Sequence, residues 1–299
     1  MAETHYGGQA VIEGVMMRGR RHMATVVRRP DGGLAEDVQV LPALYSGRLR
    51  TVPFVRGVIV LLEALVLGMK TLMYSANVSL EEEGEEVKTW YVWLVVALAL
   101  VMGVAIFFVA PMFAARAINM GSSLLFSFVE GVIRLAIFIA YLWLISLLPD
   151  IKRVFAYHGA EHMTVNAHEA GVPLEVEQVR QYSTAHARCG SSFLFVVLMV
   201  AVVVFALLGR PALWLMVLSR VLLVPLIAAL GYEIIYFGAN HQDNPVVRFL
   251  IAPGLWVQKL TTRHPDADQI EVAILALQRV LEAERREEAP LAGPEATAP

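Results

Sequence analysis

The sequence predicts a mainly α-helical, polytopic membrane protein that carries a small β-meander near its N-terminus. Hydrophobic residues make up 57% of the 299 positions, and the mean hydropathy is +0.60. Soluble domains are closer to half apolar. The excess of hydrophobic residues is concentrated in four runs that are long enough to cross a bilayer. Such a crossing needs roughly 20 apolar residues. The net charge of -3 offers no basic surface for nucleic acid. We therefore expect membrane lipid, and no nucleic acid, as a partner.

The first 50 residues have the pattern of a small antiparallel sheet. Residues 9–18 combine β-forming side chains with glycines, and the runs 22–29 and 34–41 flank the turn sequence Pro30-Asp31-Gly32-Gly33. The segment is also rich in arginine, which favours the cytoplasmic side of a membrane, next to anionic lipid. We expect residues 1–50 to form a cytoplasmic, β-rich segment.

A hydrophobic helix is expected over residues 52–74. Arg56, Glu63 and Lys70 recur every seven residues and so share one face. If this helix crossed the bilayer, Glu63 would lie near the middle, where a charge is costly unless it is paired or solvated. We therefore expect an interfacial or re-entrant helix, followed by a solvated acidic link at residues 81–86.

Four further runs have the length and composition of membrane-spanning helices. They cover about residues 90–115, 122–148, 192–208 and 212–232. Gly209-Arg210-Pro211 makes the last two a tight hairpin. Most basic residues fall before the first span, between the second and third, and after the fourth. The positive-inside rule then places both termini and the 149–191 connection in the cytoplasm of a multi-pass cell-membrane protein. This topology fails if residues 52–74 also cross the membrane.

The C-terminal part is expected to lie outside the bilayer core. Residues 246–260 have the pattern of an interfacial amphipathic helix, and about residues 267–285 show an ordinary helical packing stripe. We divide the chain into a membrane domain at 51–260, a cytoplasmic helix at 261–287 and a disordered tail at 288–299.

A metal-binding pattern occupies the cytoplasmic connection. His158 and His162 are four residues apart, so on a helix both imidazoles project from one face and can bind one metal ion. Glu161 lies beside them and could take a proton from an activated water molecule. This H-x-x-E-H order is the inverted zincin motif of a class of metallopeptidases. The alternative is a solvated polar turn of helix.

The third ligand is not fixed by the sequence. Catalytic zinc sites usually have three protein ligands and one open position. His186 is the best candidate, because its segment returns to the same interface. Cys189 is an alternative, although a lone cysteine is more often a small buried residue. Glu233 and His241 are further options at the inner end of the fourth span.

Other charged residues suggest binding of substrates or ions. Arg188 could bind an anionic group such as phosphate, although an arginine is equally expected at a lipid interface. Within the spans, Glu130 and Arg134 are spaced for an ion pair, and Arg220 lies near the middle of the fourth span. Charged residues at that depth either line a path for a substrate or ion, or pair helices structurally.

Four blocks in this order resemble a known family. They are Gly7 to Arg18, Tyr157 to His162, His186 to Gly190, and Thr261-Thr262-Arg263 with Pro265-Asp266. Together they resemble the YqhQ-like family of bacterial membrane proteins, over nearly the whole chain.

That resemblance has consequences for the site. The family is of unassigned function and is described as predicted metal-dependent enzymes, so the resemblance implies a membrane protein with a metal site. It also draws in Glu13 and Arg18 as substrate-binding candidates. The chain departs from the expected pattern at Ala187, where we expect proline, and at His264, where we expect an acidic residue.

We thus predict a membrane-embedded, metal-dependent hydrolase that acts at the cytoplasmic interface on a lipid-linked or membrane-protein substrate. A divalent ion, preferably zinc, is the expected cofactor. The alternative is a non-catalytic transporter or scaffold that uses Glu130, Arg134 and Arg220. The sequence leaves a homo-oligomer open and names no substrate.

Overall fold

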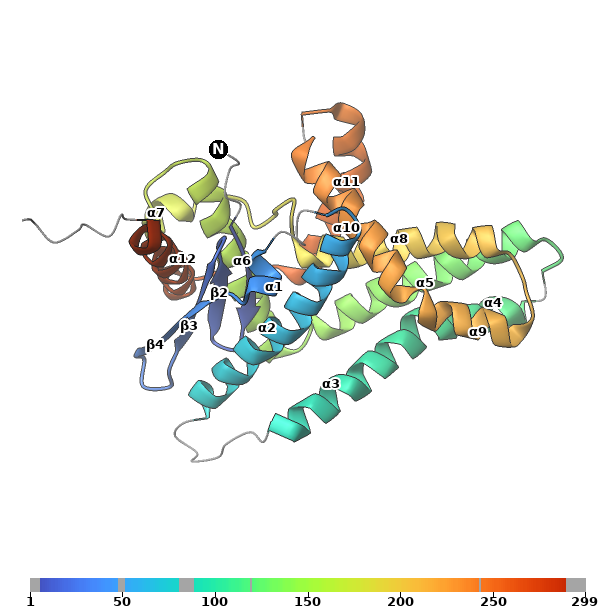
Figure 1. Ribbon diagram of the computed structural model, residues 1–299, viewed down its shortest axis with the longest axis horizontal. Coiled ribbons are helices and arrows are strands. Elements are labelled where there is room, and N and C mark those ends of the chain that lie inside the picture. Colours follow the sequence, from blue (N-terminus) through green and yellow to red (C-terminus); the bar gives the residue numbers. More distant parts are fainter. Residues whose placement is uncertain (1–5, 48–51, 81–88, 119, 242, 289–299) are drawn as a thin grey trace, which may run out of the picture.

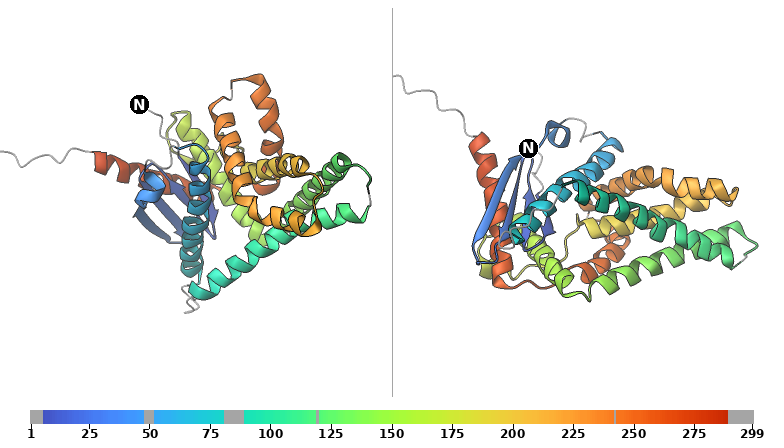
Figure 2. Two further views of the ribbon diagram at one scale, coloured as in Figure 1. Left: turned by 45° about the vertical axis from the view of Figure 1, so that its right-hand side comes forward. Right: turned by 90° about the horizontal axis from the view of Figure 1, so that it is seen from below.

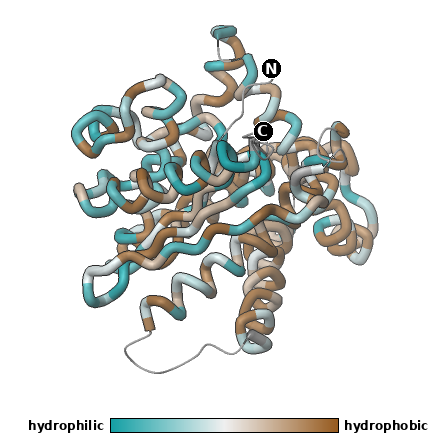
Figure 3. Tube along the Cα trace, turned by 60° about the vertical axis from the view of Figure 1, so that its left-hand side comes forward, coloured by the Kyte–Doolittle hydropathy of each residue, from teal (hydrophilic) through white to brown (hydrophobic). Residues whose placement is uncertain are grey.

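The computed structural model describes residues 6–47, 52–80, 89–118, 120–241 and 243–288. A four-stranded sheet with its covering helices forms one end of the molecule, and long helices extend away from it (Figure 1). Hydropathy separates these two parts: apolar residues predominate along the long helices, whereas polar residues recur throughout the sheet and the helices beside it (Figure 3). The chain is therefore mainly α-helical with an N-terminal β-meander, as predicted.

The sheet is a simple antiparallel meander in the order β1-β2-β3-β4. Its strands are β1 (Gly7–Val11), β2 (Gly14–Arg18), β3 (His22–Arg28) and β4 (Leu34–Val40). The predicted turn joins β3 to β4, where Gly32 has φ +86°, a conformation open to glycine without a Cβ clash. Successive side chains of each strand point to opposite faces, so both faces need a cover.

Helices from three distant parts of the chain provide that cover. One face of the sheet belongs to a core shared with α6 (Pro149–Glu169) and α12 (Ala267–Glu288). The sheet contributes Val15, Met17, Ala24 and Val26 to this core. The opposite face packs against α2 (Val55–Ser79). The sheet thus lies between α2 and the α6/α12 pair (Figure 2). We expected the N-terminal and C-terminal segments as separate units, and in the structure they share one core.

Helix α2 is the helix expected over residues 52–74, and it runs further than predicted. By length and composition it could cross a membrane. Its buried side nevertheless follows the sheet: Leu67 packs with Met16 and Met23, and Val78 packs with Val27. Glu63 is buried on that side, in an ion pair with Arg18.

The other apolar helices form a bundle. The first run consists of α3 (Thr89–Val104), the π-helix η3 (Ala105–Val109) and α4 (Ala110–Ala117). It is followed by α5 (Ser123–Ile145) and α8 (Gly190–Leu208), which meet that run and α10 in a common apolar core. Among the residues that the structure describes, and counting α2, four helices are long and apolar enough to cross a membrane, or five with the bent pair that follows.

The fourth predicted span is bent rather than straight. It divides into α9 (Leu213–Leu222) and α10 (Val224–Asn240), which meet at an angle of 49°. Pro225 explains the break, because a proline disfavours helical conformation at the residue before it and lacks an N–H to donate. The second half also continues beyond residue 232, where we expected the span to end.

The described part of the chain also contains three shorter or peripheral helices. They are α1 (Ala43–Ser46), α7 (Val176–Val179) and α11 (Pro245–Thr261). The last agrees with the predicted helix at 246–260. The predicted tail at 288–299 lies outside the described residues except for Glu288, the last residue of α12.

Acidification is expected to weaken the attachment of α12 to the sheet through Glu36. Hydrogen bonds from Arg279 hold the pKa of Glu36 below its usual 4.5, against a smaller opposite effect of burial. A carboxyl group with a lowered folded-state pKa stabilises the fold above its unfolded pKa, and this contribution is lost as pH falls through the folded value. Both side chains are about a third exposed, so we expect only about 0.5 kcal/mol.

Thermal unfolding of the wild type and Glu36→Gln checks this expectation. The advantage of the wild type should be present at neutral pH and should disappear as pH falls below the usual carboxyl pKa. A difference between the two proteins that stays constant with pH would contradict the assignment.

Candidate metal centre

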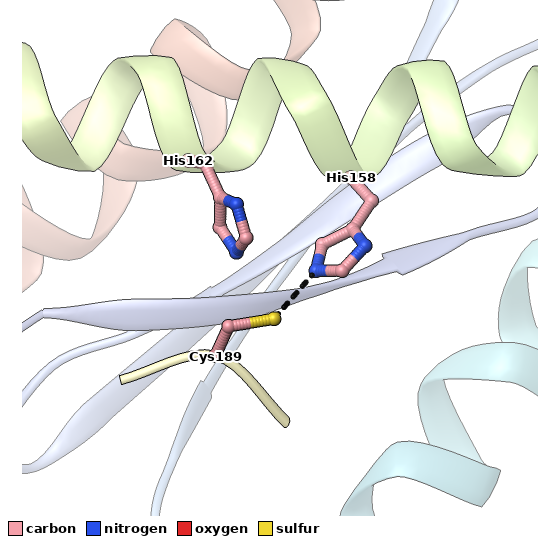
Figure 4. Close-up of side chains that lie close together, drawn as sticks. All are labelled: His158, His162 and Cys189. Carbon is pink, nitrogen blue, oxygen red and sulfur yellow. Dashed lines mark hydrogen bonds between the residues drawn. The ribbon is translucent and has the colours of Figure 1, made fainter. Parts of the chain in front are cut away.

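His158 and His162 lie on one face of α6, one helical turn apart. Pro149 and Asp150 in the first turn favour the start of this helix. Proline fits the first helical position, and a carboxylate interacts favourably with the positive end of the helix dipole. The centroids of the two imidazole rings are 4.4 Å apart. Both rings project from α6 toward Cys189, which stands on the segment opposite (Figure 4). The predicted helical pairing of the two histidines is therefore present.

Backbone carbonyls fix the tautomers of both rings. His158 Nδ1 is 2.8 Å from the carbonyl oxygen of Thr261, and His162 Nδ1 is 2.6 Å from that of Thr184. A carbonyl oxygen can only accept, so each Nδ1 must carry the proton. In the neutral ring Nε2 then has a free lone pair. Metal-binding histidines are commonly oriented by such a hydrogen bond from the other nitrogen.

Cys189 completes the cluster. Its Sγ is 3.3 Å from His158 Nε2, close to the roughly 3.5 Å expected for nitrogen and sulfur ligands on one tetrahedral zinc ion. The ligand atoms of His158, His162 and Cys189 all lie within 4.8 Å of one another. Ser191 Oγ is 3.0 Å from the sulfur and accepts a hydrogen bond from Thr261. The Ser191 proton is thus available to the sulfur.

Glu161 stands beside the two imidazoles. Its Oε2 is 3.9 Å from Nε2 of His158 and 3.9 Å from Nε2 of His162. The carboxylate is buried beneath β1, where a Cβ on Gly8 would lie only 3.0 Å from Glu161 Cγ. The same Cβ would clash with the Met16 carbonyl oxygen, so glycine at this position lets β1 pack closely against both β2 and the acid. A carboxylate so placed can either take a proton from a water molecule or act as a fourth ligand.

Side chains that the sequence analysis passed over hold the segment before Cys189 in place. Asn166 on α6 donates to the carbonyls of Ser183 and Ala185. Gln258 on α11 is buried, accepts from the His186 N–H and donates to the His186 carbonyl. Gly159 allows α6 to approach the carbonyl of Arg263 so closely that no Cβ would fit. The Thr261 block marked this region in the sequence, although its role became visible only in three dimensions.

His186, expected as the third ligand, lies beside the cluster but faces elsewhere. Its ring centroid is 5.7 Å from that of His162, while its Nε2 is 3.5 Å from a carboxylate oxygen of Glu169. Glu169 also pairs with Arg188. Burial raises the pKa of Glu169, but the hydrogen bond from His186 and the charge of Arg188 outweigh it, so the pKa lies below its usual value. In this geometry Cys189, the alternative candidate, is the residue next to both histidines.

The two remaining candidates for a metal ligand make other contacts. Both carboxylate oxygens of Glu233 accept from Arg56. His241 stacks on Phe237, with a centroid separation of 4.1 Å, and its Nδ1 is hydrogen bonded to the Phe237 carbonyl. Neither belongs to the cluster of His158, His162 and Cys189.

The two residues suggested by the family resemblance form internal ion pairs. Arg18 pairs with Glu63 on α2 and donates to the Tyr45 carbonyl. Glu13 pairs with Arg153 on α6 and accepts from Tyr157. Burial, followed by the charge of Glu13, raises the pKa of Tyr157. These contacts fasten the sheet to α2 and α6, and a role in substrate binding remains a prediction.

Glu130, Arg134 and Arg220 meet inside the bundle, away from the metal cluster. Glu130 accepts from Arg134 at 2.5 Å and from Arg220 at 2.8 Å. The expected ion pair on α5 therefore exists, and Arg220 from α9 joins it.

Comparison with known proteins gives the family of the chain. The profile of a family described as "Protein of unknown function (DUF1385)" matches residues 52–283. The chain is 35% identical over 297 residues to "Uncharacterized protein YqhQ" of Bacillus subtilis (strain 168), over 93% of each chain. No solved structure matches. The resemblance drawn from the four blocks is thereby confirmed, and the chain belongs to the DUF1385 family, the family of YqhQ-like proteins.

Proposed function

We propose that this protein is a membrane-embedded, metal-dependent enzyme whose centre is held by His158, His162 and Cys189. One observation carries the proposal. Two backbone carbonyls bind the Nδ1 atoms of the histidines, so both Nε2 lone pairs lie next to the Cys189 thiol. Imidazoles used only for packing do not need this shared orientation. His186 remains the alternative third ligand.

The donor set suits zinc. Two imidazole nitrogens and one thiolate match the nitrogen and sulfur ligands that zinc prefers, and three protein ligands leave one position open. A zinc ion held there would supply Lewis-acid chemistry and lower the pKa of water. Glu161, 3.9 Å from both Nε2 atoms, would take the proton from the attacking water. This assignment makes hydrolysis the favoured reaction.

The location of the cluster supports a substrate from the membrane interface. Helix α6 follows α5 after only a short turn, and Cys189 directly precedes α8. The cluster therefore lies where two apolar helices reach the sheet-bearing part of the molecule. Lipid headgroups, lipid-linked intermediates and segments of membrane proteins are the substrates that we propose for this position.

The packing of α2 supports the proposed topology. If α2 covers the sheet without crossing, then α3 to α4, α5, α8 and the bent pair α9/α10 make four crossings. An even number places both termini and the metal cluster on one side of the membrane. The excess of basic residues in these segments supports the cytoplasmic side of the cell membrane for this face.

Metal analysis of the purified protein, together with Glu161→Gln, tests the proposal. The wild type is expected to hold close to one zinc ion per chain. Glu161→Gln keeps the shape of the side chain but cannot take a proton, so it should retain zinc and lose hydrolysis by at least about 100-fold. Phospholipid vesicles, with phosphatidylethanolamine and phosphatidylglycerol, and a peptide copy of a membrane-spanning segment are the substrates to assay.

Two other outcomes would contradict parts of the proposal. Loss of zinc in Glu161→Gln would make Glu161 the fourth ligand of a closed, structural site and would contradict the catalytic role. Absence of zinc, iron and manganese from well-folded protein would overturn the metal centre. In that case the buried group of Glu130, Arg134 and Arg220 would favour the alternative, a transporter or scaffold.

A further inference from the structure

A second polar cluster lies within the apolar bundle, and the metal centre does not explain it. Glu130 and Arg134 come from the middle of α5, and Arg220 comes from α9, two residues before that helix ends. All three side chains are at most 1% exposed. We call these three residues the buried arginine cluster.

The charges of this cluster do not balance. Two guanidinium groups share one carboxylate, and arginine keeps its proton in proteins. Glu130 lies between the two positive groups and forms an ion pair with each of them. The cluster then carries one excess positive charge in an apolar bundle, where an uncompensated charge costs several kcal/mol.

Both arginines also retain a free donor. Arg134 Nη1 and Arg220 Nε are buried and have no hydrogen-bond partner among the described residues. The guanidinium carbons of both residues lie over the ring of Phe205, at 5.1 Å for Arg134 and 4.3 Å for Arg220. The aromatic ring of Phe205 offsets part of the positive charge. The two donors still have no hydrogen-bond partner among the described residues.

The helices that surround the buried arginine cluster are irregular next to it. In a regular helix the Phe107 carbonyl would accept from residue 111, but Pro111 has no N–H. The chain forms the π-helix η3 at this point, and the Phe107 carbonyl accepts from Arg134 Nε at 3.0 Å instead. Arg220 stands next to the 49° bend of α9 and α10. Irregular helices inside membranes commonly surround sites for ions or substrates.

We propose that the buried arginine cluster binds one small monovalent anion of the chloride class. One negative charge neutralises the excess positive charge, and a spherical halide can accept a hydrogen bond from the free donors, Arg134 Nη1 and Arg220 Nε. A divalent anion would overcompensate and would lose more hydration energy on entering this apolar position. Binding of the anion would strengthen the pairing of α5 with α9 that Glu130 and Arg220 already make, independently of the metal centre.

Thermal unfolding of the intact, detergent-purified protein tests the site. Sodium chloride replaces sodium gluconate at constant ionic strength, because gluconate is too large and too well hydrated for this position. Each tenfold increase of chloride above its dissociation constant should raise the midpoint by about 3–5 °C. Line broadening of the chloride NMR signal measures the binding directly.

Variants then assign the effect to the cluster. Arg220→Gln leaves the neutral pair of Glu130 and Arg134, and Arg134→Gln leaves the neutral pair of Glu130 and Arg220, so each should lose the chloride effect. Arg210→Gln is the matched control, because Arg210 donates to the Met120 carbonyl at the end of the bundle and takes no part in the cluster. It should respond to chloride as the wild type does.

Two results would overturn the proposal. One is a wild type whose midpoint is the same in chloride and gluconate and that broadens no chloride signal. The other is a chloride effect that survives in whichever of Arg220→Gln and Arg134→Gln folds. Because the zinc content can be measured in the same samples, failure of the anion site is distinguishable from failure of the metal centre.

Discussion

Replacing Cys189 with serine is expected to lower zinc affinity more than about 100-fold, whereas His186→Ala should lower it no more than about 10-fold. The difference follows from the geometry, in which Cys189 Sγ is 3.3 Å from His158 Nε2 and His186 Nε2 faces Glu169 instead. Loss of a residue outside the ligand set typically costs 10- to 100-fold in affinity, and loss of a direct ligand should exceed this range. Competition with a zinc chelator, followed on purified protein, measures both values.

The two variants control each other, since both residues are buried and belong to the same segment. Serine keeps nearly the shape of cysteine, and circular dichroism can establish that both variants retain the helical content of the wild type. The reverse order of zinc loss would make His186 the third ligand, as the sequence alone suggested. Equal retention of zinc in both variants would remove this segment from the metal centre.

Glu130→Gln is expected to have the largest effect on stability, a loss of about 3–5 kcal/mol in the free energy of unfolding. The substitution removes the single carboxylate that Arg134 and Arg220 share, and breaking a buried ion pair by removing one partner leaves an uncompensated charge. Detergent-induced unfolding in sodium gluconate, in mixed micelles, measures the loss without an added small anion.

A double variant separates charge from packing. Glu130→Gln with Arg220→Gln restores the net charge of the wild-type cluster, so it should regain part of the stability that the single variant loses. Glu36→Gln, which removes a pair whose side chains are about a third exposed, serves as the small-effect control. A loss for Glu130→Gln as small as that of Glu36→Gln would show that the buried pair is not a major contribution to the fold.

Local pattern predicted much of the architecture. The alternation of apolar residues and the Pro30 to Gly33 turn predicted the β3–β4 hairpin, because strand periodicity and turn chemistry act within a few residues. Long apolar runs predicted α5 and α8, because the length and composition of a run can also be read from neighbouring residues. The bend between α9 and α10 was missed, although Pro225 and its effect on the helix are local features.

The candidate metal centre shows which features the sequence alone could not predict. The spacing of His158 and His162 suffices to place both rings on one helical face, since i and i+4 always coincide there. The choice between His186 and Cys189 depends instead on how Asn166 and Gln258 hold the preceding segment. These contacts join α6 and α11, which are far apart in the sequence.

By itself, then, the sequence determined the membrane class, the meander, the histidine pair and, through four blocks, the family. The tertiary structure decided which side chains share a site. It put α2, α6 and α12 on the two faces of one sheet, and it brought Arg220 to the pair of Glu130 and Arg134. The physical reason is one of range: periodicity and capping follow from neighbouring residues, whereas burial of charge and orientation of ligands depend on the whole chain.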